Sequence, residues 1–141
     1  MFSQLRRLQL VALLAFAACG PAFSQDPRAS ETQYLAREWL KLTDSGNAQA
    51  AWQAAGRKFQ AAMTPEQWER ALAGQRAPFG ALVQRTFNGA SFRGDIPNQP
   101  PGDYALLMFR TTFANRSVVF ESISLEREGD GRWRVVGYVL R

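Results

Sequence analysis

The chain has 141 residues, of which 17 are lysine or arginine and 12 are aspartate or glutamate, so that its formal net charge is +5. This length predicts one domain. The absence of histidine and the single cysteine exclude Ser-His-Asp triads, zinc sites built from cysteine and histidine, and an internal disulfide. We expect no cofactor and no metal. The arginines are scattered, which argues against a nucleic-acid partner, because binding nucleic acid requires a concentrated basic stripe.

Residues 1–24 have the pattern of a signal peptide. Arg6-Arg7 forms a positive start, the apolar run Leu8–Ala18 follows, and Ala22-Phe23-Ser24 offers small residues to a signal peptidase. The apolar run is too short to span a membrane, which needs roughly 20 apolar residues. We therefore expect cleavage after Ser24, a periplasmic or secreted protein, and a single mature domain over residues 25–141.

Cys19 leaves a second processing route open. Phe16-Ala17-Ala18-Cys19 is similar to a bacterial lipobox, in which the cysteine becomes the lipidated first residue, although phenylalanine replaces the usual leucine. In that case the protein would be a lipid-anchored envelope protein. Association with a membrane is expected only if Cys19 is lipidated.

Three helices are predicted in the first half of the mature chain. Asp26-Pro27 is a typical helix start, and Gly46 can close that helix as a left-handed cap. Asn47 then begins an alanine-rich helix. Thr64-Pro65-Glu66-Gln67 has the capping-box pattern and begins the third helix, which ends near Ala77-Pro78 because the residue before proline avoids helical geometry.

The second half predicts an antiparallel sheet. Leu82–Phe87 alternates as a strand, and Asn88-Gly89 indicates a turn that would place Ser91–Arg93 in a short hairpin return. Residues 95–103 are rich in proline and glycine and predict a loop. Tyr104–Arg141 reads as a three-stranded meander. The fold class is therefore α+β, with N-terminal helices packed on a curved antiparallel sheet that ends in this meander.

Two turns determine the expected register of the meander. A turn at Gly129-Asp130-Gly131 places Glu126 opposite Arg134, a favourable cross-strand pair. A turn at Asn115-Arg116 places Arg110 opposite Glu121, at the end of an apolar face. The opposite face is apolar too, so we expect the helices on one face, and a ligand or a second subunit of a homodimer on the other.

Arg110 and Glu121 are the first candidate site. They form a structural ion pair, or they anchor the polar group of a ligand. A catalytic role would make Glu121 a base, together with Tyr104 or Tyr138. An arginine opposite Glu121 argues against that role, because a neighbouring positive charge lowers the pKa of a carboxyl group.

The aromatic residues are the second candidate. Trp39, Trp52 and Trp68 each lie on one predicted helix, and with Tyr104 they could line a ligand cavity. Large rings at helical spacing more often form the core, and we favour that interpretation.

Several segments that together cover most of the mature chain form a recognisable pattern. They are Trp39-Leu40, Asp44-Ser45-Gly46, Ala51-Trp52, Gln67-Trp68, Arg76-Ala77-Pro78-Phe79-Gly80, Arg85, Gly102-Asp103-Tyr104, Thr112-Phe113, Glu121, Leu125 and Gly131–Tyr138. This pattern resembles the bacterial domain-of-unknown-function family 4019. The resemblance implies a small exported or envelope-associated protein and brings no catalytic residue. The order of helices and meander is also similar to cystatin-like folds of the nuclear transport factor 2 type, in which a curved sheet wraps a long helix.

Three functions remain open at this point. We favour a non-enzymatic periplasmic module that binds a small apolar ligand or an envelope protein. The first alternative is an isomerase- or dehydratase-like enzyme with Glu121 in a conical pocket. The second is an envelope protein anchored through Cys19.

Overall fold

The computed structural model describes residues 26–141. The predicted signal peptide, its cleavage site and Cys19 lie outside the described residues. None of the helices in the described part is long and apolar enough to cross a membrane.

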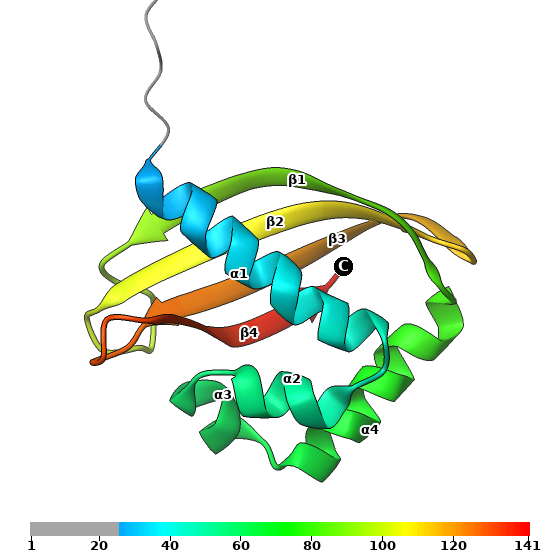
Figure 1. Ribbon diagram of the computed structural model, residues 1–141, viewed down its shortest axis with the longest axis horizontal. Helices are drawn as coiled ribbons and strands as arrows, with labels where there is room; N and C mark the ends of the chain where they lie inside the picture. Colours follow the sequence, from blue (N-terminus) through cyan, green and yellow to red (C-terminus); the bar gives the residue numbers. More distant parts are fainter. Residues whose placement is uncertain (1–25) are drawn as a thin grey trace, which may run out of the picture.

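The first half of the described chain is helical, as predicted, but it forms four helices where three were predicted, because the chain turns at Ala55-Gly56 and a separate helix follows. One long helix crosses the sheet, and three shorter helices lie beyond the strand at one edge (Figure 1). The helices are α1 (Pro27–Asp44), α2 (Ala48–Ala54), α3 (Arg57–Ala62) and α4 (Pro65–Arg76), and the 3-10 turn η1 (Ala77–Phe79) follows.

The predicted helix starts are confirmed by their caps. Asp26 accepts a hydrogen bond from the backbone N–H of Arg28, and Asn47 accepts one from Ala50. Thr64 begins α4 with a full capping box, since its side chain accepts from Gln67 and Gln67 accepts from the backbone of Thr64. These caps satisfy amide groups that have no partner inside a helix.

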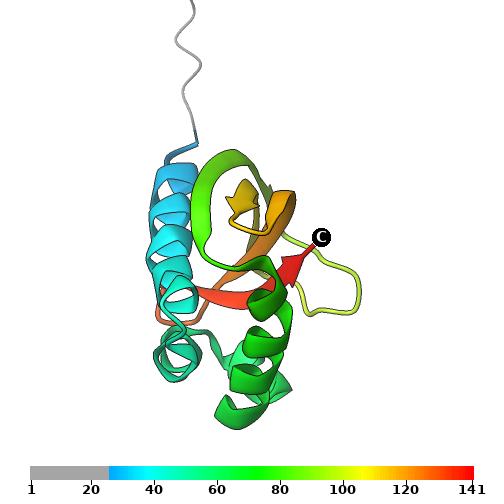
Figure 2. The same ribbon diagram turned by 90° about the vertical axis from the view of Figure 1, so that its right-hand side faces the viewer.

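The second half forms one antiparallel sheet in which neighbours in sequence are neighbours in space. The α+β class and the meander are confirmed. Figure 2 shows α1 as a layer against one side of this sheet, with α4 below it. The strands are β1 (Leu82–Arg93), β2 (Asp103–Phe113), β3 (Arg116–Arg127) and β4 (Trp133–Leu140).

The predicted hairpin at Asn88-Gly89 is wrong. The chain continues through these residues as one strand, and all of β1 pairs with β2. The register shifts between Phe87 and Gly89, so Asn88 is an extra residue of a β-bulge. Gly89 has a φ of 149°, which a residue without Cβ adopts readily. A bulge keeps the strand direction, whereas the same Asn-Gly letters would reverse it in a hairpin.

The predicted register of β2 against β3 is wrong by one residue. The turn lies at Ala114-Asn115, one residue earlier than predicted, and a second shift follows near Val118. Arg110 therefore lies opposite Phe120, and Glu121 lies opposite Phe109. Because side chains alternate between faces, this shift places Arg110 and Glu121 on opposite faces of the sheet.

The register of β3 against β4 is confirmed near its turn. Glu126 lies opposite Arg134 and Leu125 opposite Val135, as predicted. The register then shifts between Ser124 and Leu125, where Val136 of β4 is an extra residue, so that Ile123 lies opposite Tyr138 and not Gly137.

The helices cover the inner face of the sheet. This inner face is buried and contains Ala105, Leu107, Phe109, Thr111, Glu121, Ile123, Leu125, Val135 and Tyr138. We call the opposite side the open face. It leaves Leu106, Phe120 and Val139 between 38% and 44% exposed.

Candidate functional site

Glu121 is the charged residue at the centre of the inner face. Its exposed fraction is 0%, and it lies on β3. It accepts hydrogen bonds from the hydroxyls of Thr111 and Tyr138, each at 2.5 Å, and from Nε of Arg85 at 2.7 Å. Both carboxylate oxygens therefore have donors, which is what a buried carboxylate requires.

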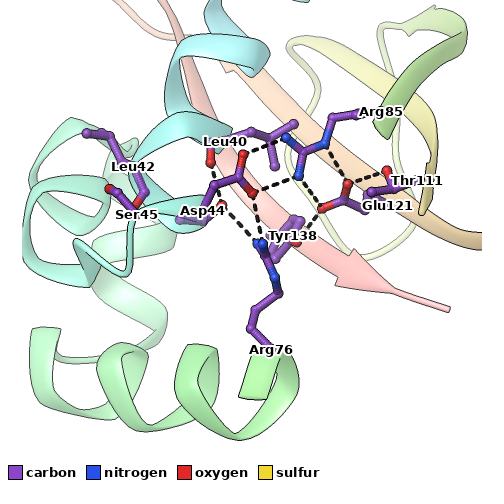
Figure 3. A network of polar contacts seen from close by, with 10 residues as sticks. Leu40, Leu42, Asp44, Ser45, Arg76, Arg85, Thr111, Glu121 and Tyr138 are labelled. Carbon is purple, nitrogen blue, oxygen red and sulfur yellow. Dashed lines mark hydrogen bonds and ion pairs between the residues drawn. The ribbon is translucent and has the colours of Figure 1, made fainter. Parts of the chain in front are cut away.

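Arg85 connects Glu121 to the end of α1. Its two terminal nitrogens lie 2.7 and 2.9 Å from the carboxylate oxygens of Asp44. Asp44 in turn accepts from Arg76 at 2.9 Å. The four side chains alternate in charge, so the formal charges within this group cancel. Figure 3 shows these contacts, with Tyr138 and Thr111 at the Glu121 end.

Each member of this buried network comes from a different element. Asp44 is the last residue of α1, and Arg76 is the last residue of α4. Arg85 belongs to β1, Thr111 to β2, Glu121 to β3 and Tyr138 to β4, and each of these strand residues points to the inner face. The network therefore joins two helix ends to all four strands.

The charges shift the pKa values of the groups they contact. Burial alone would raise the pKa of Asp44, but the hydrogen bonds and charges of Arg85 and Arg76 outweigh it and lower that pKa. Burial, and then the charge of Glu121, raises the pKa of Tyr138 well above its usual range. Burial opposes the charged form of Arg85, yet Asp44 and Glu121 raise its pKa overall.

An aromatic cluster fills the space between the helices and the inner face next to this network. The ring of Trp39 lies 5.7 Å from Trp68, 5.5 Å from Tyr138 and 5.8 Å from Phe59. Trp39 and Trp68 are 3% and 2% exposed. These rings occupy the volume in which a conical pocket would have to lie.

The predicted site residues are dispersed. Trp39 and Trp68 belong to the core, whereas Trp52 is half-buried and donates through Nε1 to the backbone of Met63. Tyr104 is buried against α3, where its hydroxyl contacts Nζ of Lys58 at 2.6 Å. Arg110 is exposed on the open face. Of the predicted residues, Glu121 and Tyr138 belong to the buried network, in which Tyr138 donates to Glu121.

Asp44, Arg76 and Arg85 were not predicted as site residues. Each occurs among the segments that carry the family resemblance, but nothing in the local pattern indicates that they meet. Arg85 and Glu121 are 36 residues apart in sequence, and Arg85 and Asp44 are 41 apart. One signal in the sequence points to Arg85. It is a charged residue on the inward-facing side of β1, because Gln84 and Thr86 on either side of it point outward.

The chemistry open to this network is limited. A general base must reach the substrate proton, and Glu121 is fully buried with three hydrogen-bonding partners. A hollow of about 450 Å³ reaches the other end of the network, at Asp44 and Arg76. Within residues 26–141 no group of three or more His, Cys, Asp or Glu side chains could hold a metal ion.

The comparisons with known proteins bear on the family alone. The family model described as "Protein of unknown function (DUF4019)" matches residues 35–138. No curated protein and no solved structure gave a significant match. The match begins within α1, ends at Tyr138 and includes every member of the buried network. The chain therefore belongs to the DUF4019 family of proteins of unknown function.

Proposed function

We propose that this domain is a non-enzymatic binding module of the bacterial envelope that docks a partner protein on the open face of its sheet. The observation that carries the proposal is the exposure of apolar side chains on that face. Leu106 and Phe120 are each 38% exposed and Val139 is 44% exposed, from three adjacent strands. Exposed apolar residues bordered by polar ones are typical of interaction surfaces.

Arginines on the open face indicate the chemistry of the partner. Arg110 lies directly opposite Phe120, and Arg141 exchanges two backbone hydrogen bonds with Phe120, at 2.8 and 2.9 Å. Directly opposite residues share a face, so Phe120 is flanked by an arginine on either side. A partner with carboxylates next to an apolar side chain would complement this row.

Among the strand residues that the structure describes, no carboxylate side chain on the open face is left for these arginines. On the described strands, Glu126 points to this face, and it is ion-paired with Lys58 at 3.0 Å. A second copy packed through the open face would therefore bring arginines without acidic counterparts. For this reason an acidic partner protein is favoured over a homodimer through this face.

The buried network supports binding over catalysis. Proton abstraction by Glu121 would require water or substrate to displace Thr111, Tyr138 or Arg85, each of which satisfies a buried charge. The network instead holds the sheet and helices together behind the open face. A rigid sheet lowers the entropy cost of binding, because its side chains are already ordered.

The finer fold and localisation remain part of the proposal. A long helix across a curved antiparallel sheet supports kinship with cystatin-like folds of the nuclear transport factor 2 type (Figure 1). The signal-peptide pattern of residues 1–24 supports export, and Cys19 supports the alternative of a lipid anchor. The mass of the mature N-terminus separates these two routes, since a start at Gln25 excludes lipidation.

Site-specific photo-crosslinking in the envelope of the native host tests the open face. A photo-crosslinking amino acid is placed at Leu106 or Val139, and at Gln49, which is exposed on α2, as the control. We expect one discrete adduct from both open-face positions and none from Gln49. We also expect Arg110→Glu to abolish the adduct without changing the melting temperature, because Arg110 is exposed.

Three outcomes would contradict the proposal. The first is an adduct from Gln49 as abundant as the adducts from Leu106 and Val139. The second is no adduct from either open-face position, and the third is an adduct that Arg110→Glu leaves unchanged. An adduct with the mass of two copies of the chain would identify the open face as a homodimer interface and overturn the acidic partner.

A further inference from the structure

Strand β1 is an edge of the sheet with an unpaired outer side. It runs for 12 residues and pairs only with β2. In an antiparallel pair, alternate residues turn their N–H and C=O groups away from the neighbouring strand. Among the described residues, none donates to or accepts from these outward groups of β1. Such an edge can pair with another extended chain.

A groove with an apolar side on the strand runs beside the second half of this edge. It has a volume of about 260 Å³ and lies between the start of α1 and β1. Phe87, Ala90 and Phe92 line it from β1, and Asp26, Ala29, Ser30 and Gln33 form a partly polar side at the start of α1. The three β1 side chains are half-buried. A groove of this size accommodates one or two apolar side chains.

Exposed apolar side chains lie at the other end of the same strand. Val83 is 65% exposed and Leu82 is 37% exposed. The register against β2 shifts between Leu82 and Gln84, so Val83 is an extra residue without a partner on β2. Tyr34 is 63% exposed and lies one helical turn beyond Ser30, on the side of α1 that lines the groove.

We propose that two copies of the chain pair through β1, antiparallel, about a two-fold axis near Asn88. Such pairing places the first half of each β1 beside the second half of the other. The apolar side chains at the start of one strand then lie next to the groove at the end of the other. Each copy contributes both surfaces, as an isologous interface requires.

The register of this pairing is consistent along the strand. With Arg85 opposite Ala90 of the second copy, Gln84 lies opposite Ser91 and Val83 opposite Phe92. Arg85 and Ala90 both point to the inner face, since they pair with Thr111 and Leu107. Gln84 and Ser91 both point to the open face, since they pair with Thr112 and Leu106. Opposite residues therefore share a face, the polar Gln84 meets the polar Ser91, and Val83 reaches the groove beside Phe92.

A second copy is favoured over an unrelated peptide because both halves of the interface lie on one strand. The backbone edge requires an extended chain, and the groove requires an apolar side chain next to it. The start of β1 supplies both. This interface is distinct from the open face and does not rest on the proposed partner.

The dimer is tested by sedimentation equilibrium. The protein is purified from the envelope in its exported form. We expect a dimer that Val83→Lys weakens by at least about ten-fold in Kd, because the lysine would lose hydration against Phe87 and Phe92, and the nearby carboxylate of Asp26 is already paired with Arg28. Val139→Lys is the matched control, since Val139 is also an exposed valine of an edge strand, 44% exposed on the open face. It should leave the dimer Kd unchanged.

Disulfide crosslinking tests whether the two-fold axis of the dimer lies near Asn88. In a Cys19→Ser background, Asn88→Cys should form a disulfide-linked dimer under mild oxidation, and Val139→Cys should remain monomeric. The inference is overturned if the wild-type protein is monomeric at all concentrations measured. It is also overturned if Val83→Lys leaves the dimer intact, or if Val139→Lys dissociates it instead, which would identify a dimer through the open face.

Discussion

Nε of Arg85 lies 2.7 Å from the carboxylate of Glu121, and the two side chains are 7% and 0% exposed. Arg85 belongs to β1 and Glu121 to β3, so the pair spans β2 between them. Breaking an ion pair buried to this degree costs more stability than breaking a surface pair, because the remaining charge is left buried with neither its partner nor water to solvate it.

Replacing Glu121 with glutamine should destabilise the protein strongly. Glu121→Gln keeps the side-chain volume but leaves the buried charge of Arg85 with Asp44 alone. We expect a loss of about 3 kcal/mol in the free energy of unfolding, measured by urea denaturation. Glu69→Gln on the exposed side of α4 should change it by less than about 0.5 kcal/mol. Equal effects of the two substitutions would show that the buried pair contributes little.

Alkaline pH should destabilise the protein through Tyr138. Its folded pKa is raised, whereas in the unfolded chain it titrates near the ordinary value of 10.0. Above about pH 10 the unfolded state releases this proton and the folded state keeps it, so stability falls as pH rises. Stability from this group is fully present below that pH.

Tyr138→Phe removes this titration and should flatten the decline in the urea midpoint between about pH 9 and pH 11. Tyr34→Phe is the control, because Tyr34 is 63% exposed and should leave the decline as in the wild type. A decline as steep in Tyr138→Phe as in the wild type would rule out Tyr138 as its source.

Two glycine-to-alanine substitutions should have opposite signs. A Cβ at Gly56 would lie 3.0 Å from Cγ1 of Val136 and 3.2 Å from Cβ of Arg134, where α3 meets β4. Gly56→Ala should therefore cost about 1–3 kcal/mol of stability. Gly74 lies within α4 with nothing within 4 Å of an added Cβ, so Gly74→Ala should add about 0.5–1 kcal/mol. Urea denaturation of both variants checks this, and a shared sign contradicts the packing of α3 on β4.

Val118 should be under backbone strain. Its φ is 59°, in the left-handed region that β-branched residues avoid, at the bulge that displaces Glu121 from the predicted register. Val118→Asn should raise the free energy of unfolding by about 1 kcal/mol, because asparagine tolerates this conformation. Val139→Asn, at an equally exposed valine without positive φ, should not raise it. A decrease in Val118→Asn would mean that the apolar contacts of Val118 outweigh its strain.

The parts of the fold that depend on near neighbours were predictable. Asp26, Asn47 and Thr64 begin their helices as their side chains predict, since a cap is a contact over two or three residues. The pairing of Glu126 with Arg134 follows from a short turn and opposite charges, and it is confirmed. The predicted pair of Arg110 and Glu121 is wrong, because the intervening turn and bulge each change the register.

The amino-acid pattern alone was enough to predict the α+β class, the order of helices and meander, and the residues at which α1, α2 and α4 begin. These features follow from capping residues, periodicity and turn chemistry, which act over a few residues. Which face of the sheet is buried, and which arginine Glu121 meets, depends on the packing of the whole domain. Bulges at Asn88, Val118 and Val136 determine both, and a bulge depends on the neighbouring strand and the packing around it. Arg85 reaches Glu121 and Asp44 because the sheet and α1 place them together, a relationship that no local pattern encodes.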